Sequence, residues 1–148
     1  MALYRIISDQ IHPNRFKQTP CSITKDDKPL WDVLVSRSRE EFEFDSVSGI
    51  RITFTHERSF FKKITTLYID GVEFCSFVKR SSDIGADRLW LDGSNRVYEN
   101  QTRICSIDRP WRNESDPKVV LRWEHENDRY EVPIAYYACL TWVDADRF

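Results

Sequence analysis

The sequence predicts an all-β domain, or a β-rich domain with one short helix, folded as an antiparallel sandwich or a small closed barrel of about 8–10 strands. Three observations support this fold class. Short runs alternate apolar and polar residues, with turn residues roughly every 8–12 positions. Aromatic residues make up 14% of the chain, and aromatic side chains suit the pleated, half-buried surface of a sheet. Helical spacing, by contrast, is seen in one ambiguous segment.

Chain length, net charge and the N-terminal residues indicate the number of domains, the kinds of partner and the location of the protein. The 148 residues are expected to form a single β-rich domain, 1–148, whose core is large enough to need neither disulfides nor metal. The 22 Lys and Arg against 24 Asp and Glu give a formal net charge of -2, which argues against a nucleic-acid partner bound by counterion release. No apolar run reaches the roughly 18 residues of a membrane span. The N-terminal residues lack a secretory signal, so an intracellular protein, cytoplasmic or nuclear, is expected.

The first third of the chain gives two different signals. Pro13–Asp27 is polar and aperiodic, so it is predicted to be a loop. The next segment, 29–41, fits two structures equally well. Leu30 and Leu34 have helical spacing, whereas Val33 to Val35 also fits a buried strand.

Three hairpins are predicted in the middle of the chain, because alternating runs there flank residues that favour tight turns. They comprise residues 42–55 with a turn at 45–49, residues 67–78 with a turn at Asp70-Gly71, and residues 89–98 with a turn at Asp92-Gly93. In the first of them, Gly49 is expected to take left-handed backbone.

The last third is predicted to consist of strands at 103–107, 119–123, 130–134 and 136–143. The final run is apolar on both of its alternating faces, which favours a central strand covered on both sides. Pro133 lacks an N–H donor, so it implies a bulge or an edge position. The polar segments 80–87 and 108–117 are predicted to be loops, and the second is long enough to carry function.

The four cysteines are Cys21, Cys75, Cys105 and Cys139. Their wide spacing contains no CxxC pair, which argues against a zinc ribbon and a redox motif. Three of them lie in strand-like runs, where a free cysteine behaves as a small hydrophobic residue. Buried free thiols are therefore expected, with a reactive thiol or two disulfides as the alternative.

Catalytic signatures are missing from the sequence. There is no GxSxG elbow, and the four glycines lie too far apart for a phosphate-binding loop, so the common nucleotide-dependent enzymes are excluded. No metal-ligand spacing occurs, and no cofactor is expected. His56 and His125 are each followed by glutamate and could act as metal ligands or as a base with its acid. Surface or turn histidines are the favoured interpretation.

Arginines interleaved with tryptophans give the one positive signal for recognition. Both residue types are enriched at protein interfaces. Trp123 and Trp142 lie in predicted strands and are expected in the core. Trp111 lies in a loop between two prolines, where little apolar sequence is available to bury it. The residues proposed to contact a partner are Trp90, Arg109, Trp111 and Arg112.

The sequence therefore favours a non-enzymatic binding or adaptor module. It would recognise a protein partner through Arg- and Trp-rich loops and a sheet edge near Trp90. The alternative is a barrel that binds a small apolar or glycan ligand, with His56 and His125 serving a small isomerase or hydrolase. Stacking of single-stranded nucleic acid on Trp and Arg is a third and weaker possibility.

Overall fold

The computed structural model describes residues 2–8, 18–38, 41–46, 49–58, 63–79, 88–92, 95–109 and 117–143. Within these ranges the chain forms eleven β-strands and one helix. The strands are β1 (Leu3–Ile7), β2 (Thr19–Lys25), β3 (Lys28–Ser38), β4 (Glu41–Ser46), β5 (Arg51–Arg58), β6 (Lys63–Ile69), β7 (Val72–Lys79), β8 (Arg88–Leu91), β9 (Arg96–Glu99), β10 (Thr102–Asp108) and β11 (Val119–Trp123), and the helix is α1 (Glu131–Val143).

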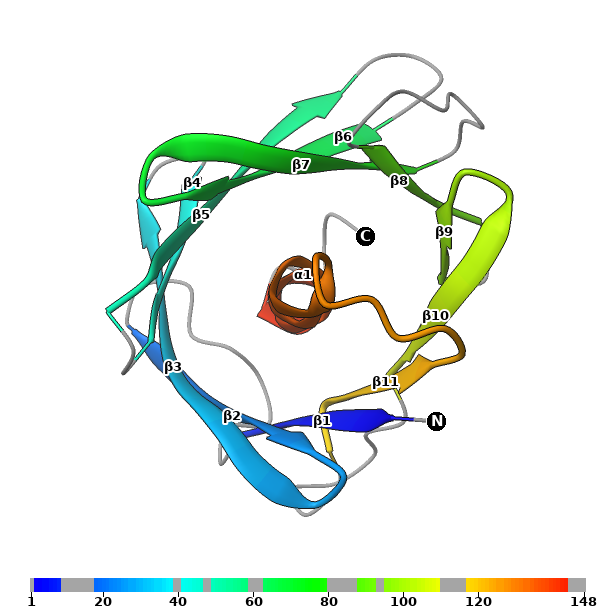
Figure 1. The fold of residues 1–148 in the computed structure, drawn as a ribbon. Helices are drawn as coiled ribbons and strands as arrows, with labels where there is room; N and C mark the ends of the chain where they lie inside the picture. The colour runs from blue at the N-terminus through cyan, green and yellow to red at the C-terminus, as the bar shows by residue number, and fades with distance from the viewer. Residues whose placement is uncertain are drawn as a thin grey trace.

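The strands form a closed barrel in which each strand pairs with the next one along the chain, and β1 pairs with β11 to complete the circle (Figure 1). All neighbours are antiparallel except β7 and β8. This exception follows from the strand number, because directions can alternate all the way round only when the number is even. Register shifts in β2–β3, β6–β7 and β9–β10 interrupt the ladder, as bulges do where a sheet must curve.

The barrel interior is filled by the chain itself. Alternate strand residues point inward, and the inner faces carry mainly medium-sized apolar side chains such as Ile6, Val33 and Leu67. Helix α1 runs through the centre of the barrel (Figure 1). Each of its residues from Pro133 to Trp142 is buried. Because the helix is surrounded on all sides, it has no polar face.

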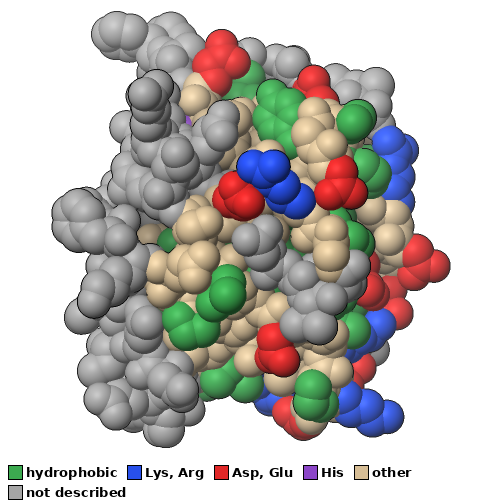
Figure 2. Space-filling model, turned by 90° about the vertical axis from the view of Figure 1, so that its left-hand side faces the viewer, with side chains coloured by type: hydrophobic (Ala, Val, Ile, Leu, Met, Phe, Trp, Pro, Cys, Tyr) green, Lys and Arg blue, Asp and Glu red, His purple; other side chains and the backbone are tan. Residues whose placement is uncertain are grey.

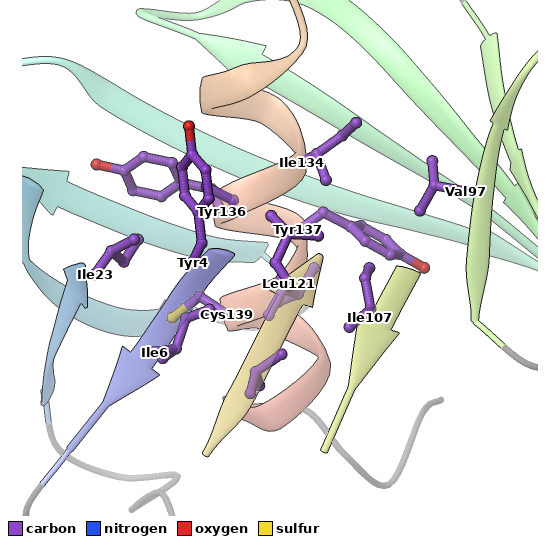
Figure 3. Close-up of a cluster of buried hydrophobic side chains, with 14 of the residues drawn as sticks. Tyr4, Ile6, Ile23, Val97, Ile107, Leu121, Ile134, Tyr136, Tyr137 and Cys139 are labelled. Carbon is purple, nitrogen blue, oxygen red and sulfur yellow. The ribbon is translucent and has the colours of Figure 1, made fainter. Parts of the chain in front are cut away.

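Aromatic side chains of α1 contact several sectors of the wall. Tyr137 stacks on Phe77 of β7, with ring centroids 4.1 Å apart and planes 12° apart. Tyr136 packs against Phe44 of β4 at 5.6 Å and Trp31 of β3 at 5.7 Å. In Figure 3, Tyr136 and Tyr137 point from the helix in different directions. The helix is therefore packed against the wall on more than one side.

Polar contacts hold both ends of α1. In its first turn, Glu131 accepts a hydrogen bond of 2.7 Å from the Tyr4 hydroxyl and lies 3.4 Å from Lys25 Nζ. A carboxylate there also favours the helix dipole. At the other end, the Arg109 guanidinium donates to the Thr141 carbonyl oxygen at 3.1 Å. Arg109 thus satisfies one of the last carbonyl groups of the helix, and Tyr4 and Lys25 hold the Glu131 side chain of the first turn.

The predicted closed β-barrel is confirmed, with eleven strands in the described residues instead of about 8–10. The three hairpins are also confirmed as β4–β5, β6–β7 and β8–β9. The turn predicted at Asp92-Gly93 is wrong for the last one, because it would pair Trp90 with Asn95, and Trp90 pairs with Tyr98 instead. Asp70 and Gly71 both have positive φ, at 50° and 82°, as a tight hairpin turn requires. Gly49 has φ 78°, the left-handed backbone expected of it.

The predicted strands at 130–134 and 136–143 are wrong, because both segments belong to α1 apart from Tyr130, which precedes it. A run that is apolar on every face fits a helix buried all round as well as a central strand. Pro133 lies in the first turn of the helix, where the missing N–H costs no hydrogen bond. It does not mark a bulge.

Two uncertainties in the first third are resolved. The described residues of segment 29–41 are extended: β3 covers Lys28–Ser38, and β4 begins at Glu41. The loop predicted over Pro13–Asp27 is wrong for Thr19–Lys25, which is strand β2. The inward-facing residues of this strand are Thr19, Cys21 and Ile23, and they alternate with more exposed residues. Because two of the three are not strongly apolar, the alternation is hard to see in the sequence. The predicted loop 80–87 lies outside the described residues.

Figure 2 views the barrel wall from the side of β3. On the described part of this face, hydrophobic side chains are scattered between charged and polar ones. A surface ion pair joins Arg51 and Glu43 of neighbouring strands at 3.0 Å. Within the described ranges, no helix has the length and apolar character to cross a bilayer.

Candidate functional site

The β8–β9 hairpin presents two aromatic side chains on the outer wall of the barrel. Leu89, Leu91 and Val97 are buried and face inward. Because side chains alternate along a strand, Trp90 and Tyr98 face outward. They are directly opposite each other in the hairpin register, and both are half-buried. Trp90 is one of the predicted contact residues, whereas Tyr98 is not.

Trp90 and Tyr98 form an ordered stack. Their ring centroids are 4.0 Å apart and their planes differ by 7°. The Trp90 indole N–H donates to the carbonyl oxygen of Asn100 at 2.7 Å, which fixes the ring orientation. The two rings thus come from neighbouring strands and are in contact across the hairpin.

A charged network supports this stack. The Tyr98 hydroxyl donates to Asp92 Oδ2 at 3.1 Å, and Arg96 Nε lies 2.8 Å from the same oxygen. The other oxygen of Asp92 accepts the Arg96 backbone N–H at 3.1 Å. One carboxylate therefore fixes the turn, the tyrosine and the arginine together.

Arg103 continues the row of outward side chains onto β10, where it is paired with Tyr98. Its Nε lies 2.7 Å from Glu124 Oε1, and this hydrogen bond raises the pKa of Arg103. Arg96 and Arg103 have 42% and 40% of their side chains exposed, so both guanidinium groups are partly accessible. On the β7 side the row ends at Val78, which is paired with Trp90 and buried.

We call this set of residues the Trp90–Tyr98 surface: Trp90, Asp92, Arg96, Tyr98 and Arg103. Sequence reasoning missed four of the five. The local pattern does not give Tyr98, because a two-residue turn at Asp92-Gly93 would pair Trp90 with Asn95, whereas the observed register pairs Trp90 with Tyr98 across a longer connection. The short connection between β9 and β10 then sets Arg103 opposite Tyr98.

The surface lies beside the start of the predicted 108–117 loop. The backbone N–H of Ile107 donates to the Asn95 carbonyl oxygen at 2.9 Å, which joins the β8–β9 turn to the end of β10. Arg109 is exposed and donates a hydrogen bond to the Thr141 carbonyl oxygen at the end of α1, and its contact with a partner stays a prediction. Trp111 and Arg112 lie outside the described residues, and their contact with a partner stays a prediction.

The two histidines considered for catalysis are not brought together. His56 is on β5, where its Nδ1 lies 3.0 Å from Thr65 Oγ1. His125 is exposed and follows β11. The antiparallel pairings make β5 parallel in direction to β1, and β11 antiparallel to β1. Strands β5 and β11 therefore end at opposite ends of the barrel. His56 and His125 therefore do not share one site.

Other candidate residues belong to the core. Trp123 and Trp142 are each 1% exposed, as expected, although Trp142 is in a helix and not in a strand. All four cysteines are buried free thiols. Within the described residues, no group of three or more His, Cys, Asp and Glu side chains is placed to hold a metal ion. The chemistry that the described outer wall offers is aromatic contact with flanking guanidinium donors.

Comparison of the chain with protein-family models, with curated proteins and with solved structures finds no match.

Proposed function

We propose that the protein is a non-enzymatic binding module that recognises a protein partner through the Trp90–Tyr98 surface, together with the neighbouring 108–117 segment. The observation that carries this proposal is the stacked, half-buried Trp90–Tyr98 pair flanked by two partly exposed arginines. Tryptophan, tyrosine and arginine are the residue types that contribute most to binding energy at protein interfaces.

Pre-ordering of these side chains supports the proposal. Binding normally costs about 0.5–1.5 kcal/mol for each mobile side chain that becomes fixed. Trp90 is already held by Asn100, and Tyr98 by Asp92. Arg96 and Arg103 are each paired with a carboxylate. A partner would therefore meet a surface whose conformational entropy is already reduced.

The geometry favours a protein over single-stranded nucleic acid. A nucleobase stacks on an open aromatic face. In this pair one face of each ring is covered by the other ring, at 4.0 Å. The next outward positions are Val78 on one side and Arg103 on the other. Within the Trp90–Tyr98 surface, the charges of the two arginines are balanced by Asp92 and Glu124, so its described side chains carry no strong positive charge for phosphates.

The alternative, a small ligand held inside the barrel, has less support. The small-ligand alternative was based on the abundance of aromatic residues, which could line a cavity. Several of those aromatics pack on the central helix, as the Phe77–Tyr137 stack does. The axis of the barrel is occupied by α1 (Figure 1). Of the two histidines assigned to that chemistry, His56 is on β5 and His125 follows β11, and these strands end at opposite ends of the barrel.

Site-specific photocrosslinking in the cells that make the protein tests the proposal. Tyr98 is replaced by the photoreactive residue p-benzoylphenylalanine, which keeps an aromatic ring at this position. We expect a discrete crosslinked protein adduct after irradiation. Replacing Arg103 by alanine in the same chain should reduce its yield several-fold, because a flanking donor is lost.

Two controls come from the opposite wall. Leu34 on β3 is 43% exposed and lies five strand steps from β8, so the same photoreactive residue there should give no such adduct. Arg51→Ala removes a surface ion pair without touching the stack and should leave the yield unchanged. Equal adducts from positions 34 and 98, or none from position 98, would contradict the proposal. An adduct sensitive to nuclease would identify nucleic acid instead.

A further inference from the structure

Two cysteines that are far apart in the sequence are in contact inside the barrel. Sγ of Cys21 on β2 lies 3.2 Å from Sγ of Cys139 on α1. The two side chains are 5% and 0% exposed. A disulfide has its sulfurs about 2.05 Å apart, so the atoms need to approach by only about 1.2 Å.

The position of this contact on the helix is informative. In Figure 3, Cys139 points from α1 toward the strands that carry Ile6 and Ile23, whereas Tyr137 points to the other side. Two residues along a helix turn the side chain by about 200°. The helix ends are held by Glu131 and by the Arg109–Thr141 hydrogen bond. Cys139 lies between them, where a bond to β2 would fix the middle of the helix.

We propose that Cys21 and Cys139 are an oxidation site, which a peroxide converts into a disulfide that ties the central helix to the barrel wall. In the first step the Cys21 sulfur attacks the peroxide O–O bond, giving a sulfenic acid and water from hydrogen peroxide. In the second, the Cys139 sulfur attacks the Cys21 sulfur, and the hydroxyl leaves with the Cys139 proton as a second water. Two thiols and one hydrogen peroxide thus give one disulfide and two waters.

The order of these steps follows from the surroundings of the two thiols. Cys21 has the greater exposure, although it is small. The contact with Cys21 and burial both raise the pKa of Cys139, which keeps that thiol protonated. Hydrogen peroxide is small and uncharged, so it suits a buried site better than a bulky charged disulfide. Since the thiolate is the reactive form, oxidation of the resting protein is slow.

The other two cysteines provide a matched comparison. Cys75 is on β7 and Cys105 is on β10, three strand steps away. Neighbouring strands are about 4.8 Å apart, so these two residues are separated by more than about 10 Å, whereas a disulfide needs Cα atoms within about 7 Å. Both are buried and form no disulfide, like the proposed pair. They therefore control for burial, because they are too far apart to be linked to each other.

The test uses the purified, reduced full chain. It is treated with excess hydrogen peroxide, unreacted thiols are alkylated, and the protein is digested without reductant for peptide mass mapping. We expect one linked peptide pair containing Cys21 and Cys139, and two alkylated cysteines in place of four. The Cys75→Ala and Cys105→Ala variants should form the same link, and Cys139→Ala should not.

The oxidised chain should also melt at higher temperature. The link closes a loop of 118 residues between its ends, which should raise Tm by about 10 °C or more, reversibly on reduction. The wild-type peptide map does not depend on any variant folding. Four alkylatable thiols after peroxide treatment, both in buffer and in urea below the unfolding transition, would overturn the proposal. So would a link between other cysteines, or sulfinic acid at Cys21 without a link.

Discussion

Two aromatic stacks with nearly the same geometry lie on opposite faces of the barrel wall, and they allow a sharp test of what fills the barrel. Phe77 and Tyr137 stack at 4.1 Å and 12° inside. Trp90 and Tyr98 stack at 4.0 Å and 7° outside. If α1 supports the interior as a packed core, then Tyr137→Ala should destabilise the protein much more than Tyr98→Ala.

The expected magnitudes follow from burial. Tyr137 is 1% exposed. An aromatic side chain buries about 150–250 Å², and truncating a buried one to alanine costs about 3–5 kcal/mol. We expect about 4 kcal/mol for Tyr137→Ala. Tyr98 is half-buried and would lose about half that area and one partly exposed hydrogen bond to Asp92, so we expect about 1–2 kcal/mol.

Urea unfolding followed by far-ultraviolet circular dichroism measures both values, because that signal does not depend on Trp90 fluorescence. The total stability of a domain is about 5–15 kcal/mol, so Tyr137→Ala leaves little margin. Tyr137→Leu and Tyr98→Leu repeat the comparison with smaller losses. Equal costs at the two positions, or a larger cost at Tyr98, would refute the interpretation of α1 as the core of the barrel.

Three further outcomes are expected. Burial and then the hydrogen bond to Glu131 raise the pKa of Tyr4, so its folded form holds the phenol proton more tightly than the unfolded form. The free energy of unfolding should therefore fall above about pH 10, and Tyr4→Phe should lessen that slope by about 1.4 kcal/mol per pH unit in denaturant titrations. Arg109→Ala should lower stability by about 0.5–1.5 kcal/mol through loss of its hydrogen bond to the helix end, and an unchanged Tm would contradict that role. Gly71→Ala should cost about 1 kcal/mol in urea unfolding because φ is 82° there, although a Cβ would meet no atom within 4 Å, and no loss would show that the turn adapts.

The parts of the fold that the sequence predicts well are those specified by neighbouring residues. Asp70-Gly71 determines a tight turn by its own backbone preferences, and the strands on both sides follow from it. Closure of the barrel is different, because it depends on pairings such as Leu3 with Arg122 across nearly the whole chain. No short pattern encodes such a pairing, so the choice between sandwich and barrel could not be made from the sequence.

The same distinction applies to the candidate site. Trp90 could be selected because Arg and Trp are enriched at protein interfaces. Tyr98 could not, because the tight turn predicted at Asp92-Gly93 implies a different register from the observed pairing of Trp90 with Tyr98. The hydrogen bond from Arg109 to α1 could not be predicted, because its acceptor Thr141 is 32 residues away on a helix that the sequence pattern suggested to be a strand. A long-range contact to an unpredicted element leaves no local signal.

The helix nevertheless becomes predictable once the strand number is known. Side chains of the wall are just sufficient to fill a barrel of eight strands, and eleven strands enclose a wider space. The inner faces here carry residues such as Val33, Ile52 and Leu121, which are too short to meet across that space. An α-helix with its side chains is about 10–12 Å across, which suits the gap. A helix that fills the barrel must be apolar on every side. The run from Pro133 to Trp142 meets this condition, because its apolar residues are not confined to one face of the helix. Medium-sized side chains on the inner faces of the strands and one segment that is apolar on every side therefore predict a central helix together. Neither feature predicts the helix by itself.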